Sequence, residues 1–198
     1  MSEAPVTQIG TGRKPLPPTP GQTVGPFFGY ALPFERGSEL VDRAHPGAIR
    51  LHGVVYDGAG TPVPDAIVEI WQADADGSIA QETGSLKRDG FTFTGFGRAP
   101  VDNVGRYTFT TVNPGPTSPG SAPFIAVAVF ARGLMNRLFT RIYLPEGGEA
   151  LASDALLGAL EPERRDTLVA TRDADGGLRF DIRLQGEGET VFLDFEGR

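Results

Sequence analysis

The side chains that most often act as nucleophiles, general bases or metal ligands are few in this sequence. There is no cysteine, which excludes a thiolate metal site and a cysteine nucleophile. The two histidines are His45, beside Pro46 in a connector, and His52, inside a predicted strand. An imidazole in such a place is more often solvated or hydrogen-bonded, and a histidine metal site needs further ligands and orienting partners. Neither histidine is therefore a strong candidate for catalysis.

Other chemical motifs are equally sparse. A Ser-His-Asp set stays open on residue counts alone, but no G-x-S-x-G nucleophile turn and no Walker-type phosphate loop occur. The segment 74–77, Asp-Ala-Asp-Gly, resembles part of a calcium-binding loop without its later ligands, and it is interpreted as a turn. Tyr56, Tyr107 and Tyr143 lie in predicted strands and are most simply packing residues. By its own residues, the chain is a poor enzyme.

The composition limits what the chain can bind. Its net charge is −7, whereas binding to nucleic acid or to an anionic membrane needs concentrated Lys and Arg, so neither is an expected partner. No stretch approaches the roughly 18 apolar residues of a membrane span. The first residues lack the basic and apolar regions of a signal peptide. Because the absence of cysteine is compatible with a reducing compartment, we expect a cytoplasmic protein.

The elements that must position any site are predicted to be short strands, since 27 glycines and 17 prolines accompany few helical patterns. Segment 124–131 is almost continuously apolar, as in a strand covered on both faces. The best helical stretch is 153–160, with Ser153 or Asp154 as N-cap, and Pro162 starts a second short turn of helix. Strand signals occur at 49–56, 66–73, 106–112, 124–131, 138–144, 178–184 and 190–195, with a weak one at 91–96.

These elements predict a mainly β protein, an antiparallel β-sandwich with one or two short helices, over residues 48–198. Residues 1–47 are predicted to form an N-terminal arm, partly extended and covered by a partner. Its first 20 residues are rich in Pro, Gly and Thr and cannot form a helix. The adjacent Phe27 and Phe28 need a burial site, which favours an arm lying on another surface.

Several segments together resemble the intradiol ring-cleavage dioxygenases, and in particular the alpha-type subunits of the two-subunit members of that family. The likeness extends almost without interruption from residue 19 to residue 195, and its last segment is the most specific. The fold implied is the β-sandwich of that family with an extended N-terminal arm. The segments are TPGQTVGPF at 19–27, GVVYD at 53–57, VEIWQAD at 68–74, VNPG at 112–115, VFARG at 129–133 and FDIRLQGEGETVF at 180–192.

The resemblance also implies that iron is not held here. Catalytic subunits of the family bind a ferric ion with two tyrosinates and two histidines, and hard phenolate oxygen suits Fe(III). Carried over by the motifs, those ligand positions fall on Ile79, Thr117, Phe124 and Ala126. Three of these side chains cannot donate to a metal, and one threonine hydroxyl is not enough. The chain is expected to have no metal ligands and no catalytic residues of its own.

The resemblance implies a homologous beta subunit as the partner, with the Fe(III) bound there. The complex would use O2 to open a small aromatic substrate, protocatechuate, between its hydroxyl-bearing carbons, giving 3-carboxy-cis,cis-muconate. This chain would supply part of the substrate-pocket wall and an assembly surface. Arg132 is the natural counterion of a substrate carboxylate, and the arm residues expected in the wall are Thr23, Gly25, Pro26 and Phe27, the last at a position where tyrosine is more usual.

Two other interpretations stay open at this point. The chain would be a non-catalytic β-sandwich binding or scaffold module if it had kept the fold and lost both ligands and partner. A stand-alone catechol or hydroxyquinol dioxygenase would need its own four ligands and a helical segment near its start, and residues 1–47 are too rich in proline for that. A co-purifying chain that carries the two tyrosines and a His-x-His would favour the two-subunit enzyme.

Overall fold

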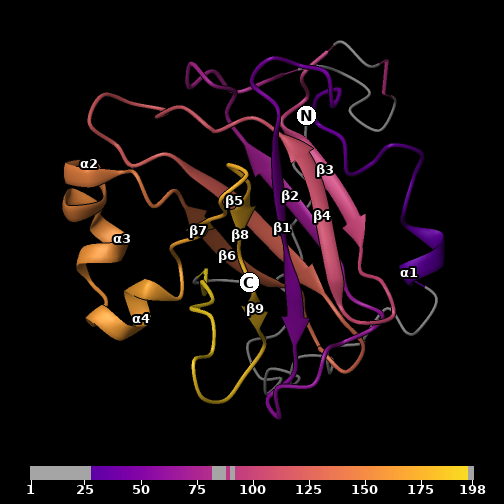
Figure 1. Cartoon of the computed structure of the whole chain (residues 1–198). Coiled ribbons are helices and arrows are strands. Elements are labelled where there is room, and N and C mark those ends of the chain that lie inside the picture. Colours follow the sequence, from indigo (N-terminus) through magenta and orange to yellow (C-terminus); the bar gives the residue numbers. More distant parts are fainter. Residues whose placement is uncertain (1–27, 82–87, 90–91, 196–198) are drawn as a thin grey trace, which may run out of the picture.

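Two β-sheets packed face to face make up the body of the protein, which we describe from a computed structural model over residues 28–81, 88–89 and 92–195 (Figure 1). One sheet has the order β4-β1-β8-β7, with β9 also paired to β1, and the other has the order β3-β2-β5-β6. The first sheet comprises β1 (Ile49–Tyr56), β4 (Arg106–Thr111), β7 (Thr171–Arg172), β8 (Leu178–Arg179) and β9 (Ile182–Arg183); the second comprises β2 (Ile67–Gln72), β3 (Phe96–Pro100), β5 (Phe124–Phe130) and β6 (Leu138–Tyr143).

Four short helices flank the sandwich where the sequence predicted one or two. They are α1 (Phe28–Ala31), α2 (Gly148–Ser153), α3 (Ala155–Gly158) and α4 (Pro162–Asp166). In Figure 1, α2, α3 and α4 lie together beyond β6 and β7, and α1 lies on the opposite side. Leu157 of α3 packs with Tyr143 of β6 in a small second apolar cluster. That cluster attaches the helices to the edge of the sheet.

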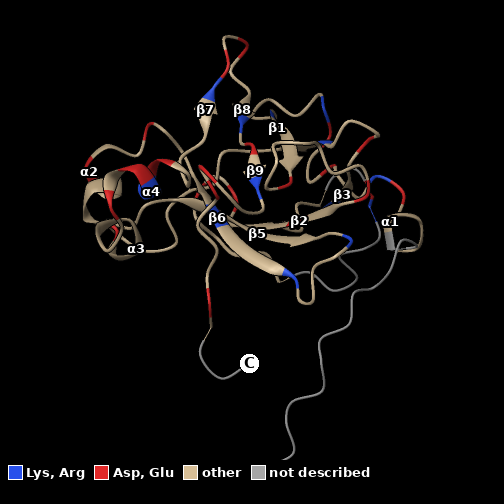
Figure 2. Cartoon of the chain, turned by 90° about the horizontal axis from the view of Figure 1, so that it is seen from below, with Lys and Arg blue, Asp and Glu red and all other residues tan. Residues whose placement is uncertain are grey.

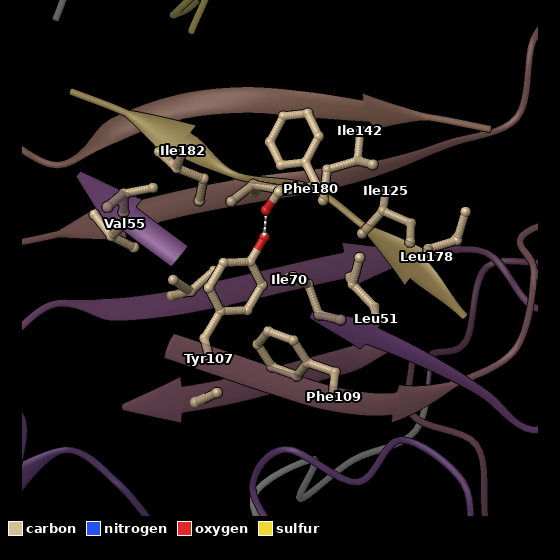
Figure 3. Packing of buried hydrophobic residues seen from close by; sticks show 14 of the residues in the cluster. Leu51, Val55, Ile70, Tyr107, Phe109, Ile125, Ile142, Leu178, Phe180 and Ile182 are labelled. Carbon is tan, nitrogen blue, oxygen red and sulfur yellow. Dashed lines mark hydrogen bonds between the residues drawn. The ribbon is translucent and has the colours of Figure 1, made fainter. Parts of the chain in front are cut away.

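The predicted antiparallel sandwich is confirmed, with one local difference. β1 pairs with β4, and β2 and β6 pair with β5, in antiparallel register, but β8 and β9 run parallel to β1. Inward side chains of both sheets interlock, as aligned sheets require. The most buried of them include Leu51, Ile70, Phe109, Ile125 and Ile182, which Figure 3 shows packed between the layers.

The predicted strand 178–184 is divided at Phe180 and Asp181 into β8 and β9. The carbonyl of Phe180 accepts a hydrogen bond from the Tyr107 hydroxyl at 2.5 Å (Figure 3). The Asp181 carboxylate accepts from the backbone N–H of Val54 at 3.0 Å, so a side chain replaces a ladder carbonyl there. A methyl group on Gly53 would overlap the Phe180 carbonyl, which is why only glycine fits at this crossing.

Two other strands differ from expectation. The weak signal at 91–96 is displaced, since β3 covers Phe96–Pro100 and residues 90–91 lie outside the described part. A Cβ at Gly97 would lie 2.5 Å from Leu40 Cδ1, so close packing of the backbone, and not β-propensity, defines that strand. Residues 190–195 form no regular strand, because their backbone pairing with β6 is an isolated bridge in which the Leu193 N–H donates to the Phe139 carbonyl at 2.7 Å.

The single helix predicted at 153–160 is replaced by α2 and α3. Asp154 has extended backbone angles, and its carboxylate caps α3 by accepting from the N–H groups of Leu156 and Leu157. The prediction of Asp154 as N-cap is confirmed, and Pro162 begins α4 as expected. The extended residue ends one helix and starts the next.

The last part of the predicted arm connects the two sheets. The Arg98 N–H of β3 donates to the Gly37 carbonyl at 2.8 Å, and the Thr110 N–H of β4 donates to the Ser38 carbonyl at 2.9 Å. Leu40 follows and is buried in the core. Residues 37–40 therefore close one edge of the sandwich. The division of the chain at residue 47 stays a prediction.

Replacing Tyr107 by Phe should lower the free energy of unfolding by about 1–2 kcal/mol, because the buried Phe180 carbonyl loses its partner. Chemical denaturation of the variant and the parent measures the difference. Tyr30→Phe is the matched control, since the Tyr30 side chain is exposed and should be neutral. Equal stability of Tyr107→Phe and the parent would contradict this account of the β8–β9 break.

Candidate functional site

The structure brings the four presumed former ligand positions to one end of the β3-β2-β5-β6 sheet. Ile79 lies in the turn that follows β2, and Ala126 lies in β5 directly opposite Trp71 of β2. The loop that leads to Thr117 is joined to that turn, because the Gly115 N–H donates to the Asp74 carbonyl at 2.7 Å. Phe124 is the first residue of β5. These segments therefore lie near one end of the sheet.

The side chains at these positions do not fit a ferric ion. Ile79 is 66% exposed and apolar, and Thr117 is an exposed hydroxyl in the adjoining loop. Phe124 and Ala126 are half-buried and have no donor atoms. Within residues 28–81, 88–89 and 92–195, no cluster of three or more His, Cys, Asp or Glu side chains is arranged to hold a metal. These four positions therefore lack the phenolate and imidazole donors that would bind ferric iron.

A network that the sequence reasoning missed occupies this end of the sheet. Arg141 of β6 lies opposite Ala126, and its Cζ is 4.0 Å from the centroid of the Phe124 ring. Its Nη1 donates to the Tyr143 hydroxyl at 3.1 Å, which in turn donates to Asp154 Oδ1 at 3.1 Å. The alternation of 138–144 already places Arg141 and Tyr143 on one face, but the partner of that face was not evident from sequence.

Tyr143 is the one tyrosine beside the former ligand positions, and it does not replace the missing ligands. Burial raises the pKa of its hydroxyl, an effect that Arg141 only partly opposes. The group therefore stays a protonated phenol engaged with Arg141 and Asp154. A tyrosinate ligand would need the opposite condition, an ionised oxygen free to reach a metal.

Arg132 lies at the other end of β5. Six residues separate it from Ala126, which corresponds to about 20 Å along a strand. Its Nε contacts Asp65 Oδ2 at 3.0 Å, while its side chain is 62% exposed. Among the described residues this is the only polar contact recorded for Arg132, so its terminal amino groups remain available for a carboxylate. The structure does not bring Arg132 to the former ligand positions of its own chain.

Asp65 is a second residue that sequence reasoning missed. Its Oδ2 fixes Arg132, and its Oδ1 is buried without a hydrogen-bond partner in the described part of the chain. Gly29 of α1 packs near the Asp65 carbonyl, since a Cβ there would lie 3.9 Å from that oxygen. The N-terminal segment therefore joins the sandwich beside Arg132 and Asp65. The arm candidates Thr23, Gly25, Pro26 and Phe27 precede this point and lie outside the described residues.

The outer face of the β3-β2-β5-β6 sheet is largely apolar. The outward residues of β5 are Phe124, Ala126, Ala128 and Phe130, and Trp71 on β2 is 51% exposed. Figure 2 draws β5 free of charged residues and shows no helix or strand of the described chain over this face. The continuous apolar run predicted a strand covered on both sides. Within the described residues the inner side is buried and the outer side is partly covered, since Ala128 is buried and Phe124 packs with Tyr143 and the flanking helices.

A hollow of about 1220 Å³ lies elsewhere, on the outer face of the β4-β1-β8-β7 sheet, and is lined by residues of β1 and β4. Its charged side chains are largely paired, with His52 Nε2 2.6 Å from Asp173 Oδ2 and Arg179 2.7 Å from Asp181. We interpret this hollow as a solvated polar face, separate from the former ligand positions. His45 likewise only accepts a local hydrogen bond from the Gly47 N–H.

No helix among the described residues has the length and apolar character needed to cross a membrane.

Comparison with known proteins relates this geometry to one family. A family model described as Dioxygenase matches residues 24–186. The chain is 42% identical to the protocatechuate 3,4-dioxygenase alpha chain of Pseudomonas putida over 200 residues, covering 91% of this chain and 98% of that one. It is 33% identical to the protocatechuate 3,4-dioxygenase beta chain of Burkholderia cepacia over 155 residues, covering 70% of this chain and 64% of that one.

A solved structure supports the same relationship. The dioxygenase domain of a dioxygenase and carbohydrate-binding protein fusion from Streptomyces sp. SirexAA-E is 29% identical, with a TM-score of 0.58. The match covers 86% of this chain and 99% of that domain. The sandwich and its sequence thus agree on one family.

The composition of the four positions generates a prediction for the isolated chain. Purified without partners, it should contain far less than one ferric ion per chain and lack the red colour of tyrosinate bound to iron. The reason is that these positions offer no phenolate and no imidazole. Metal analysis and visible absorption test this, and a tightly held stoichiometric ferric ion would contradict it.

Proposed function

The chain belongs to the intradiol dioxygenase family, and we propose that it works as the alpha-type, non-iron subunit of a two-subunit protocatechuate 3,4-dioxygenase. The observation that carries this proposal is the combination of a complete family fold with non-ligand side chains at all four former metal positions. A family whose members are iron-dependent needs its iron somewhere, and this chain cannot supply the donors. A homologous subunit that keeps them is the simplest source.

The comparisons favour the alpha-type role over the beta-type role. The likeness to an alpha chain covers nearly the full length of both proteins at 42% identity, whereas the likeness to a beta chain is 33% and covers 64% of that protein. Trp71 lies in the segment 68–74 that resembles the family, while the four presumed ligand positions carry other residues. These features support a subunit that has kept the architecture for a reason other than holding metal.

The apolar outer face of the β3-β2-β5-β6 sheet is the surface that we assign to the partner. A central strand that is apolar on both faces is normally covered on both faces. Exposed aromatic side chains with arginines beside them are the residues that dominate protein interfaces. Trp71, Phe130 and Phe139 lie on this face, with the Arg137 guanidinium 4.9 Å from the Phe139 ring centroid.

The substrate-pocket wall is assigned to the region where the N-terminal segment meets β5. Arg132 offers terminal amino groups to a carboxylate, because Asp65 holds only its Nε. Guanidinium and carboxylate form strong paired hydrogen bonds. Gly29 of α1 lies beside the Asp65 carbonyl, and Thr23, Gly25, Pro26 and Phe27 precede it in the sequence, which supports assigning both groups to one pocket wall. Asp65 acts as a positioning residue for Arg132.

The proposed complex opens protocatechuate between its two hydroxyl-bearing carbons and yields 3-carboxy-cis,cis-muconate. Both atoms of O2 enter the product, so no external reductant is needed. Ferric iron in the partner would supply the Lewis-acid and templating chemistry. This chain binds the ring carboxylate, excludes water and orients the substrate, which affects binding and positioning more than bond formation. The absence of cysteine fits a reducing cytoplasm, where we propose that the complex works.

Co-expression with a homologous chain that carries two tyrosines and a His-x-His tests the proposal directly. We expect the two chains to co-purify, to contain iron, and to take up O2 when protocatechuate is added. Each chain assayed alone is the control. If the chain is instead a non-catalytic scaffold module, the two chains will not co-purify and oxygen uptake will not rise. That outcome would refute the proposal.

Replacing Arg132 by Ala should raise the KM of the complex for protocatechuate roughly tenfold to hundredfold, because a charge-assisted hydrogen bond is lost. Iron content and kcat should stay near the parent values. Arg106→Ala is the matched control, since Arg106 is an exposed arginine on β4 of the other sheet. Steady-state oxygen uptake gives both constants, and an unchanged KM would remove Arg132 from the pocket.

A further inference from the structure

A positive charge, the Arg141 guanidinium, lies beside the start of β5. Arg141 faces Ala126 across the β5–β6 pair, and Phe124 lies two residues away on the same face. Side chains that are directly opposite on antiparallel strands have Cβ atoms about 4.5–5.5 Å apart. The guanidinium therefore occupies the patch of sheet surface that ligands at positions 124 and 126 would share.

Several contacts hold the guanidinium at this patch. Its Cζ lies 4.0 Å from the centroid of the Phe124 ring, which is a favourable cation–π geometry. Its Nη1 donates to the Tyr143 hydroxyl, and Tyr143 donates to Asp154, the residue that caps α3. The side chain is thus anchored to both the strand and the flanking helices.

The charge of Arg141 is not neutralised by an ion pair. Arg98 and Arg132 on the same sheet each have a carboxylate, Glu69 at 2.6 Å and Asp65 at 3.0 Å. For Arg141, by contrast, no ion pair within 4.0 Å is found in the part of the chain that the structure describes. Asp154 reaches it only through the Tyr143 hydroxyl. A half-buried guanidinium without a counterion projects its charge over this end of the sheet.

We propose that Arg141, stacked on Phe124 and bound to Tyr143, excludes metal cations from the former ligand positions. Loss of the four ligands then explains only part of why the chain holds no iron, because a fixed cation now occupies their surroundings. Restoring ligands without removing Arg141 would place a metal ion beside a like charge. The inference rests on the proposed function only for the identity of the former ligand positions, since the repulsion follows from the β5–β6 geometry itself.

The test uses the full chain and nickel ion, without partner or substrate. The double variant Phe124→His and Ala126→His puts two imidazoles on one face of a strand, where side chains two residues apart point the same way. Imidazole suits Ni²⁺ well. Tyr143 remains and still accepts from Arg141. Adding Arg141→Gln to this double variant should lower the nickel dissociation constant at least tenfold in a calorimetric titration at low salt.

Arg137→Gln in the same double variant is the matched control, because it removes an equal charge from the connection just before β6, away from Ala126. It should change the affinity by less than twofold, and the gain from Arg141→Gln should shrink as salt screens the repulsion. Equal affinities with and without Arg141, no binding in either, or an equal gain from Arg137→Gln would overturn the proposal. Circular dichroism confirms that each variant is folded. None of these outcomes bears on oxygen uptake by the complex, so the two proposals fail independently.

Discussion

The pairing of β2, β5 and β6 is the constraint on which the functional account depends. Their register sets Trp71, Ala126 and Arg141 side by side across the sheet, with Phe124 two residues along β5. A ferric site needs several anionic or imidazole donors on one such patch. This chain presents an indole, a methyl group, a phenyl ring and a guanidinium instead. The sandwich is intact, but none of these four side chains supplies such a donor.

The two ends of β5 have different roles in this account. At its start, the Arg141 guanidinium stacks on the Phe124 ring and leaves a positive charge at that end of the sheet. Past its other end, Arg132 is held by one nitrogen and exposed, with Asp65 behind it and α1 beside it. Between them, the outward residues of β5 are apolar, with Ala128 buried and Ala126 and Phe130 half-buried within the described chain. A homologous partner seated on this face would be contacted along the whole strand, so one surface could serve both assembly and substrate binding.

Much of the architecture was accessible from the sequence, because strand signals placed β1, β2, β4, β5 and β6 within one or two residues of their observed bounds. The parts that were missed depend on single tertiary contacts. The Asp181 carboxylate accepts a hydrogen bond from the Val54 N–H and divides the predicted strand 178–184. Leu40 packs closely on Gly97 in β3. In the site, the assignment of Ile79, Thr117, Phe124 and Ala126 to former ligand positions stays a prediction from family motifs. Arg141 and Asp65 were not recognised, because their meaning lies in the residues opposite them and not in their own spacing. Thr23, Gly25, Pro26 and Phe27 stay predictions.

Diffraction data collected at the iron absorption edge from crystals of the assembled complex would test the central claim most directly. The account predicts one strong anomalous peak per pair of chains, located among the tyrosine and histidine ligands of the partner. It predicts no peak near Phe124, Ala126 and Arg141. An iron peak coordinated by side chains of this chain would contradict the claim that its role is to shape a pocket around a metal held by another subunit.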